Sequence, residues 1–460
     1  MERESFKSRL GFLLISAGCA IGIGNVWRFP YITGKNGGGV FVLVYLFFLI
    51  TVGVPVMTME FAMGRASKQS TVRAYHVLEP AGSKWHIHGY IAMLGNYVLM
   101  SFYTTVAGWM LYYFYQFCTG HFTGLDPDGV AASFGTMLSQ PGVMGFWMMV
   151  IVLIGFGICS FGLEKGVERV TKVMMIALLG IIIVLAVRAL CLPGGLEGMK
   201  FYLVPDLARM KEVGVFTIIV EAMNQAFFTL SLGIGAMLIF GSYLQKDRTL
   251  LGESINIACL DTFVAVVSGL IIFPACFAFG INPDSGPSLI FITLPNVFNS
   301  MATGRVWGAL FFLFMTFAAF STIIAVFENL IRCCMDAWNL TRKKAVLINL
   351  VIVSIISVPC VLGFNLWSSF TPLGAGSAVL DLEDFLVSTL LLPIGSLIYL
   401  FFCVSRFGWG FDKYLAEANA GEGPKMPAGL RKYLTWVLPI FVVILLAQGL
   451  IATAMKLMAG

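Results

Sequence analysis

Long apolar segments alternate with short polar stretches along almost the whole chain. A helix needs about 20 mainly apolar residues to cross a bilayer, and on this count the pattern predicts about eleven crossings. Polar sequences such as "DPDG", "INPDSGPS" and "EGPKMP" separate the apolar segments, and no segment has the pattern of a soluble domain. The predicted fold class is therefore an all-α polytopic membrane protein. The expected crossings are centred near Ile21, Phe48, Phe102, Ile151, Ala177, Leu230, Val267, Phe317, Val353, Leu391 and Val442.

Basic residues gather in alternate loops between these crossings, and lysine and arginine mark the cytoplasmic side. This pattern places the N-terminus in the cytoplasm, and eleven crossings then place the C-terminus outside. The single Asn-x-Thr sequence, at Asn339, falls on the predicted cytoplasmic side, and with the short outer loops it favours a bacterial inner membrane. The basic residues that carry the assignment are Arg3, Lys7, Arg9, Arg65, Lys68, Arg73, Lys84, Lys165, Arg169, Lys246, Arg248, Arg342, Lys343, Lys344, Arg406, Lys413, Lys425, Arg431 and Lys432.

The composition agrees with a membrane protein and excludes several other classes. Of the 460 residues 58% are hydrophobic and 12% charged, whereas soluble domains carry about 25% charged residues; the mean hydropathy is +0.89. The net charge of +5 is expected to come from cytoplasmic loops rather than from nucleic-acid binding. Ten cysteines form no CxxC sequence and four histidines are scattered, so we predict neither an enzyme nor a metal centre or organic cofactor.

Two apolar segments are interrupted by paired glycines. Residues 18–30 read "GCAIGIGNVWRFP" and residues 224–237 read "NQAFFTLSLGIGAM", five crossings apart. Glycine-interrupted crossings at matching positions in two halves are typical of a transport site between inverted repeats. Close helix packing is the alternative, because Gly18 and Gly22 also form a small-xxx-small pattern.

Acidic and hydroxyl side chains near the interruptions suggest an ion pathway. Freed backbone carbonyls, together with Asn25, Thr229, Ser321 and Thr322, offer the oxygen ligands that hard cations prefer. Asp261 lies inside an apolar segment, where an acid usually marks an ion or substrate path. For Glu60, near the end of another crossing, a structural and a functional role are equally compatible with the sequence.

The chain resembles the neurotransmitter:sodium symporters in three stretches: "RLGFLLISAGCAIGIGNVWRFPYITGKNGGGVF", "GVPVMTMEFAMGR" and "FFTLSLGIGA". The resemblance implies the LeuT fold, with two inverted five-helix repeats and the first and sixth helices unwound at mid-membrane. It also implies sodium-coupled uptake by alternating access. The corresponding segments here are a cytoplasmic segment at 1–9, a first repeat at 10–192, a second repeat at 217–404 and an extra crossing at 431–457.

The resemblance implies two sodium sites and assigns their ligands residue by residue. The first would consist of Ala20, Asn25, Thr229, Asp261 and the carboxylate of the substrate. The second would consist of Gly18, Ile21, Ala318, Ser321 and Thr322.

Chloride is not expected. Many relatives have Asn at the position of Asp261, and the chloride-dependent ones have a hydroxyl at the position of Ala265, while Tyr45 and Gln225 of the chloride-site pattern are retained. Because two sodium charges in a pocket of low dielectric need a counter-charge, we expect the Asp261 carboxylate to replace the chloride ion.

The substrate implied by the resemblance is a neutral hydrophobic α-amino acid. Amine-transporting relatives have Asp at the position of Gly22, and the glycine leaves room for the substrate's own carboxylate, which Tyr103 would bind. The pocket offers no fixed charge to a charged side chain, and an apolar pocket separates neighbouring amino acids by only about 1–3 kcal/mol per methylene. The substrate-binding residues implied are Cys19, Ala20, Gly22, Gly24, Leu99, Phe102, Tyr103, Val106, Phe228, Thr229, Ser231, Ile234, Thr322 and Val326.

Two gates are implied as well. Arg28 and Asp384 match an outer ion pair, and Arg3 and Asp336 match an inner pair next to Tyr243. The partners expected are thus the amino acid, sodium ions and the lipid bilayer, and the sequence does not indicate an oligomeric state. The alternatives are an amino-acid sensor or channel-like protein without coupled transport, and a sodium-coupled transporter of an osmolyte such as proline or betaine.

Overall fold

The described residues of the computed structural model, 6, 8–280 and 288–459, form helices joined by turns, with one isolated β-bridge between Arg248 and Glu422. Over these residues nine helices are long and apolar enough to cross a membrane, and a tenth crossing is bent by 58° between residues 20 and 24. A further interrupted crossing consists of two helices too short to meet that criterion alone. The polytopic all-α fold class is therefore confirmed. With both interrupted segments included, the crossings are α1 and α2 (Arg9–Ala20, Phe29–Lys35), α3 and α4 (Gly39–Phe48, Val54–Ser67), α6 (Ile87–Thr119), α8 (Pro141–Ser160), α9 (Arg169–Leu190), α12 and α13 (Val215–Thr229, Ala236–Gly241), α14 (Leu250–Ala278), α16 (Gly304–Trp338), α17 and α18 (Arg342–Ile356, Val358–Leu362), α19 and α20 (Val379–Asp384, Leu392–Val404) and α22 (Leu438–Ala459).

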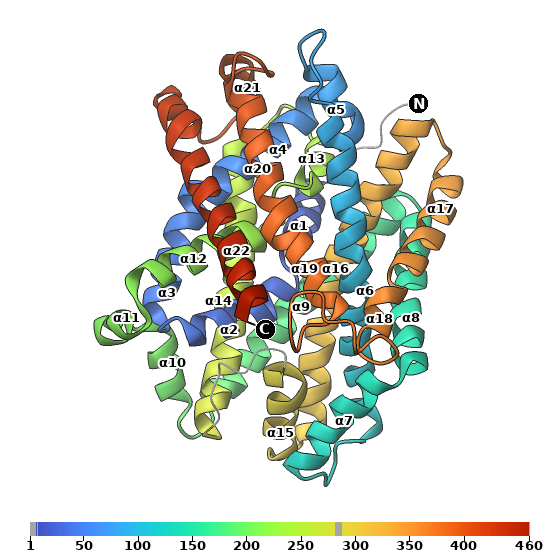
Figure 1. The fold of residues 1–460 in the computed structure, drawn as a ribbon, viewed down its shortest axis with the longest axis vertical. Helices are drawn as coiled ribbons and strands as arrows, with labels where there is room; N and C mark the ends of the chain where they lie inside the picture. The colour runs from blue at the N-terminus through green and yellow to red at the C-terminus, as the bar shows by residue number, and fades with distance from the viewer. Residues whose placement is uncertain (1–5, 7, 281–287, 460) are drawn as a thin grey trace.

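α1 and α13 lie in the middle of the bundle, and α12 runs toward its side next to α3 (Figure 1). α1 packs against α16 and α14, α12 packs against α3, and α13 packs against α4. The longest helices, α6 and α16, pack against each other along their length. The buried share of the apolar window is 83% in α16 but only 22% in the last crossing, which lies at the edge of the bundle. Central helices of this kind can hold polar groups away from lipid, because other helices cover them on all sides.

Short helices cover the two ends of the bundle. α5 (Thr71–Leu78) and α21 (Phe411–Ala418) lie at the end where the described chain begins, whereas α7 (Pro127–Ser139), α10 (Gly195–Leu203) and α15 (Leu294–Asn299) lie at the opposite end (Figure 1).

One buried and one half-exposed ion pair attach α21 to the bundle. The Arg65 Nε and the Lys246 Nζ donate to the Glu417 carboxylate across 2.7 and 2.9 Å. The Arg65 pair holds α21, at one end of the bundle, against the transmembrane helix α4.

Candidate functional site

The two backbone interruptions have different local structures. α1 ends at Ala20, and a π-helical turn resumes at Gly24 after Ile21 and Gly22 leave the helical path. Between α12 and α13 the chain turns over residues 230–235, with φ of +100° at Gly233 and +72° at Gly235. These angles lie in the region that glycine enters without steric cost. The glycines here thus permit unwound backbone, as predicted, rather than only close helix packing.

Glu60 compensates for the second interruption. Its Oε1 accepts a hydrogen bond from the Gly233 N–H at 2.7 Å, and its Oε2 accepts one from the Met237 N–H at 3.2 Å. Donors freed from a helix inside a bundle must be satisfied by other groups. Glu60 therefore has a structural role, which the sequence alone left open: its carboxylate binds the free backbone of the broken segment.

A first cluster of buried oxygen atoms joins both interruptions to α14. The Asn25 Nδ2 donates to the Thr229 Oγ1 at 3.1 Å, to the Asp261 carbonyl oxygen at 3.2 Å and to the Asp261 Oδ1 at 2.8 Å. The Thr229 hydroxyl donates to the Asp261 Oδ2 at 2.9 Å. Three oxygen atoms thus converge on one position, which the amide nitrogen occupies here. Such a donor set fits a hard cation, with the amide turned to present its oxygen.

A second cluster lies between α1 and α16. The Thr322 hydroxyl faces the carbonyl oxygens of Gly18, Cys19 and Ile21, each at 3.3 Å. The Ser321 hydroxyl faces the carbonyls of Ala318 at 2.9 Å and Ile21 at 3.4 Å. The structure therefore brings together all five residues expected for a second site and adds the Cys19 carbonyl, a backbone group that the resemblance did not assign. This cluster also consists only of oxygen atoms.

A narrow cavity opens beside the first cluster, and Gly22 forms part of its wall. A Cβ atom at Gly22 would lie 2.2 Å from the Tyr103 Oη and 2.8 Å from the Thr322 Oγ1. The Tyr103 hydroxyl also accepts a hydrogen bond from the Ile23 N–H at 2.9 Å. Only glycine lets the Tyr103 and Thr322 hydroxyl groups approach the backbone of the broken helix this closely.

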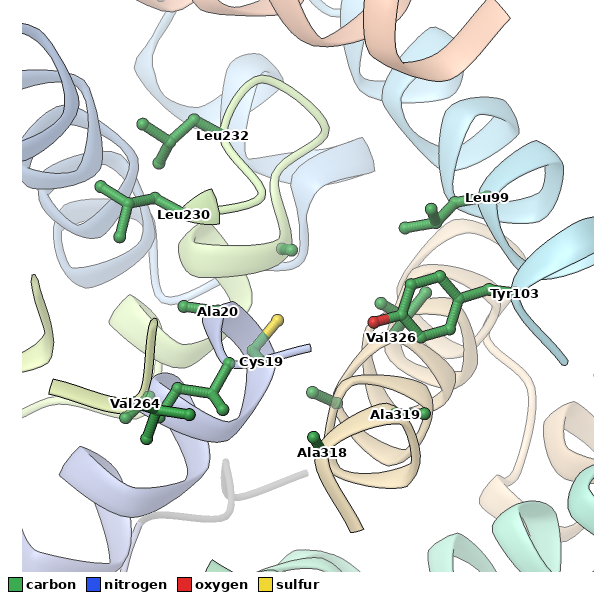
Figure 2. Packing of buried hydrophobic residues seen from close by; sticks show 14 of the residues in the cluster. Cys19, Ala20, Leu99, Tyr103, Leu230, Leu232, Val264, Ala318, Ala319 and Val326 are labelled. Carbon is green, nitrogen blue, oxygen red and sulfur yellow. The ribbon is translucent and has the colours of Figure 1, made fainter. Parts of the chain in front are cut away.

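Apolar side chains form the rest of the cavity wall. Figure 2 shows the Tyr103 hydroxyl and the Cys19 thiol directed toward the space between α1, α6 and α16, with Val326 beside it. Phe102 and Val106 lie farther out and line a wider vestibule. Val387 and Leu392 of the tenth crossing also line the cavity, and sequence reasoning missed them, since nothing marks them within an apolar helix. The cavity lining consists of Ala20, Gly22, Gly24, Leu99, Tyr103, Phe228, Ser231, Ile234, Thr322, Val387 and Leu392.

The expected outer ion pair is not formed. Arg28 and Asp384 line the same vestibule, but the guanidinium of Arg28 lies over the Phe228 ring, 4.2 Å from its centroid. The Asp384 Oδ1 accepts a hydrogen bond from the Ser388 hydroxyl at 2.6 Å. In this conformation the two charged side chains do not pair with each other. Arg28 instead contacts an aromatic ring, and Asp384 instead accepts a hydrogen bond from a hydroxyl group.

Of the expected inner pair, Arg3 lies outside the described residues. Asp336 accepts a hydrogen bond from the Ser70 N–H at 2.8 Å.

A buried network lies around Tyr243. Its hydroxyl donates to the Glu328 Oε1 at 3.1 Å and accepts from the Arg332 Nε at 2.9 Å. Arg342 also pairs with the Glu328 carboxylate. The sequence analysis named Arg342 only as a basic residue of a cytoplasmic loop and missed Glu328 and Arg332, although their spacing, four residues apart in an apolar helix, was a usable signal.

Two polar atoms near Asp261 lack hydrogen-bond partners within the described chain: the Tyr45 hydroxyl and the Gln225 Oε1. The Gln225 amide nitrogen donates to the Gly24 carbonyl at 3.3 Å. Ala265 is buried one helical turn after Asp261 and adds no polar group. The position four residues before Ala265 therefore holds the Asp261 carboxyl group, hydrogen-bonded to Asn25 and Thr229.

Comparisons with known proteins agree on one kind of protein. A model described as the sodium:neurotransmitter symporter family matches residues 3–124 and 130–459. An uncharacterized sodium-dependent transporter of Bacillus subtilis is 32% identical over 94% of this chain and 93% of its own length. The sodium- and chloride-dependent taurine transporter of Bos taurus is 28% identical over 79% of this chain and 66% of its own length. The crystal structure of MhsT in complex with L-phenylalanine superposes with a TM-score of 0.86, at 34% identity, over 97% of this chain and 100% of that one.

Proposed function

The chain belongs to the sodium:neurotransmitter symporter family, and from this premise we propose that it imports a neutral hydrophobic L-amino acid together with sodium. It is an integral membrane protein of a family of transporters, not an enzyme, and it has the LeuT fold of its structural neighbour.

One observation carries the proposal: the space at Gly22 lies between an oxygen-only cluster and an apolar cavity. A substrate carboxylate there would meet the Tyr103 hydroxyl and the backbone N–H groups of Gly22 and Ile23, which donate to the Asn25 Oδ1 and the Tyr103 Oη in this conformation. The positive end of a half-helix favours an anion there. The substrate's side chain would then extend toward Leu99, Ile234 and Val387, which offer apolar contacts and no charge.

Two sodium ions would occupy the two oxygen clusters. Asn25, Thr229 and Asp261, with the Ala20 carbonyl, would hold the first ion, and the substrate carboxylate would complete its coordination. The carbonyls of Gly18, Ile21 and Ala318 with Ser321 and Thr322 would hold the second. Because the substrate itself ligates the first ion, the binding of each would strengthen the binding of the other.

The Asp261 carboxylate would supply the counter-charge, so transport would not need chloride. The buried carboxylate next to two cations lowers their mutual repulsion in a medium of low dielectric. In this respect the chain would differ from its taurine-transporting relative, whose name includes chloride dependence.

Alternating access would come from two inverted repeats, residues 10–192 and 217–404, that rearrange around the fixed site. Segment 1–9 would be cytoplasmic, and the helix within 431–457 would be an addition outside the repeats. In this placement the Tyr243 network closes the cytoplasmic side. The vestibule lined by Arg28 and Asp384 faces outward, in a bacterial inner membrane, and that pair would close over bound substrate.

Binding and uptake of radiolabelled amino acids would test the proposal. The purified protein should bind a labelled hydrophobic amino acid in sodium but not in potassium, and neutral hydrophobic amino acids should compete best among the standard twenty. In proteoliposomes, a sodium gradient should drive accumulation, with or without chloride. Binding without accumulation would favour a sensor or channel, and competition only by proline or betaine would favour an osmolyte transporter; either result contradicts the proposal.

A further inference from the structure

A group of three metal-ligating side chains lies where α5 ends and α6 begins, at the start of the helix that farther along carries Leu99 and Tyr103 of the cavity wall. His76 is in the last turn of α5, Glu79 follows that helix, and His86 directly precedes α6. One nitrogen of each histidine and one oxygen of the glutamate all lie within 4.8 Å of one another. The proposed transport function assigns no role to these residues.

The glutamate is oriented so that one oxygen faces both imidazoles. Its Oε1 lies 3.3 Å from the His76 Nδ1 and 2.7 Å from the His86 Nδ1. Its Oε2 accepts hydrogen bonds from the Ser83 hydroxyl at 3.0 Å and from the His86 N–H at 3.2 Å. Hydrogen bonds of this kind to the second oxygen orient a ligating carboxylate, and their loss typically costs 10- to 100-fold in metal affinity.

The spacing of the three atoms suits a small tetrahedral ion. Zinc binds histidine nitrogen at about 2.0–2.1 Å and carboxylate oxygen at about 2.0–2.2 Å, so two ligands of one ion lie about 3.3 Å apart. The imidazole rings are nearly parallel, 10° apart, with centroids separated by 4.2 Å. Stacked rings direct their in-plane lone pairs in parallel, so one imidazole would have to turn out of the stack for both Nδ1 atoms and the Oε1 to reach one ion; His76, whose side chain is 50% exposed, has the space to do so.

Glu79 and His86 are largely enclosed by the protein, whereas His76 is open to solvent. The Glu79 and His86 side chains are 9% and 29% exposed, whereas the His76 side chain is 50% exposed. Three protein ligands with one accessible position are the arrangement in which zinc retains a water molecule. Two imidazoles also distinguish the cluster from the sodium clusters, which consist only of oxygen, because nitrogen ligands favour borderline transition metals over hard cations.

We propose that His76, Glu79 and His86 form a binding site for a divalent transition metal of the zinc class. The ion would join the end of α5 to the start of α6. α5 is coupled at its other end to the broken helix, since the Thr71 hydroxyl donates to the Gly235 carbonyl at 3.2 Å. The loop between the helices is held in turn by the Trp85 indole, which donates to the Phe407 carbonyl at 2.8 Å. A bound ion would therefore restrain an element that contacts the transport site's own backbone.

Zinc titration of the full-length protein tests this inference. The protein is purified in detergent with an affinity tag that contains no histidine, and its accessible thiols, including Cys118, Cys191 and Cys259, are blocked with N-ethylmaleimide. Competition against a fluorescent chelator should give one equivalent of bound zinc, with a Kd of about 1 μM or tighter. His76→Ala, Glu79→Gln and His86→Ala should each weaken binding at least ~10-fold. The matched control is His121→Ala. His121 follows α6 and contacts Ser133 of α7, so this substitution should leave the zinc affinity unchanged.

Cobalt provides a second readout of the same site. Co²⁺ added to the wild-type protein should give the intense visible absorption of a four-coordinate ion, and each of the three variants should lose it while keeping its thermal denaturation temperature in the absence of metal. Absence of saturable zinc binding, or equal affinity in the variants and in the wild type, would overturn the proposal and leave a hydrogen-bonded His–Glu–His group. The titration contains neither sodium nor amino acid, so its outcome is independent of the proposed transport function.

Discussion

At the scale of single residues, Gly22 is the position where adding one methyl group should have the largest effect on amino-acid affinity. In Gly22→Ala the new Cβ would lie 2.2 Å from the Tyr103 Oη, which is too close for any side-chain rotation of the alanine to relieve. Overpacking of this kind costs about 1–3 kcal/mol, so we expect amino-acid affinity in a sodium-dependent binding assay to fall about 5- to 150-fold.

Gly157→Ala is the control for this variant, because a Cβ at Gly157 meets no atom within 4 Å. It should bind the amino acid with the wild-type affinity. Unchanged affinity in Gly22→Ala would show that the carboxylate of the substrate does not occupy the space beside Tyr103.

Asp261 is the residue on which the proposed chloride independence depends. Removing its charge in Asp261→Asn should weaken sodium-dependent binding at least ~10-fold, because opposite charges about 4 Å apart attract by about 4 kcal/mol at an effective dielectric of 20. Combining this change with Ala265→Ser would add the missing hydroxyl, and chloride should then stimulate the variant. Uptake in chloride and in gluconate measures the effect.

Ala265→Ser alone should remain independent of chloride, since the carboxylate is still present. Chloride stimulation of the wild-type protein, or none in the double variant, would contradict the proposed role of Asp261.

At the scale of helices, Glu60 binds the backbone of the second interrupted crossing. Glu60→Ala would leave the N–H groups of Gly233 and Met237 without their acceptor, and each buried unsatisfied group costs about 1–3 kcal/mol. The thermal denaturation temperature should therefore fall markedly, and less so in Glu60→Gln, which keeps one acceptor oxygen.

Glu197→Ala serves as the comparison for Glu60→Ala, because Glu197 is exposed in α10. Its free energy of unfolding should change by less than about 0.5 kcal/mol. Equal stability of the two alanine variants would mean that other groups or water satisfy the broken segment.

The helices also show which features the sequence could predict. Glycine pairs in apolar segments predicted both interruptions, but for different reasons: Gly233 and Gly235 adopt backbone angles that few other residues reach, whereas Gly18 and Gly22 allow close contact with neighbouring helices. The partner of those free backbone groups was not predictable, since Glu60 belongs to a helix more than 170 residues earlier. The same limit applies to His76, Glu79 and His86: their spacing crosses the end of one helix and the start of another, and only the turn between them brings the side chains together.

At the scale of the whole molecule, the network around Glu328 joins α16 to Tyr243 and Arg342 at one end of the bundle, which we propose to be the closed cytoplasmic end. Glu328→Gln would leave the buried side chains of Arg332 and Arg342 without their carboxylate, and breaking a buried pair typically costs 3–5 kcal/mol. We expect amides of α1 and α13 to exchange faster with deuterium, and sodium-driven uptake to fall while amino-acid binding persists.

The exposed pair of Arg431 and Asp412, 3.7 Å apart, provides the comparison. Exposed pairs contribute little, so Asp412→Asn should change neither deuterium exchange nor uptake. If Glu328→Gln also left both unchanged, the network would be a feature of packing and not a gate.

The last helix, α22, lies at the edge of the bundle, yet it touches the element that carries part of the cavity wall. A Cβ at Gly449 would lie 2.5 Å from the Thr389 Cγ2, and Thr389 is two residues from Val387, which lines the cavity. The outward side of α22 exposes apolar residues such as Ile440 and Ile451. If the proposed cavity binds the substrate, a single helix separates the substrate's surroundings from lipid, and changes in bilayer thickness or lateral pressure would act on the protein one helix away from the residues that select its substrate.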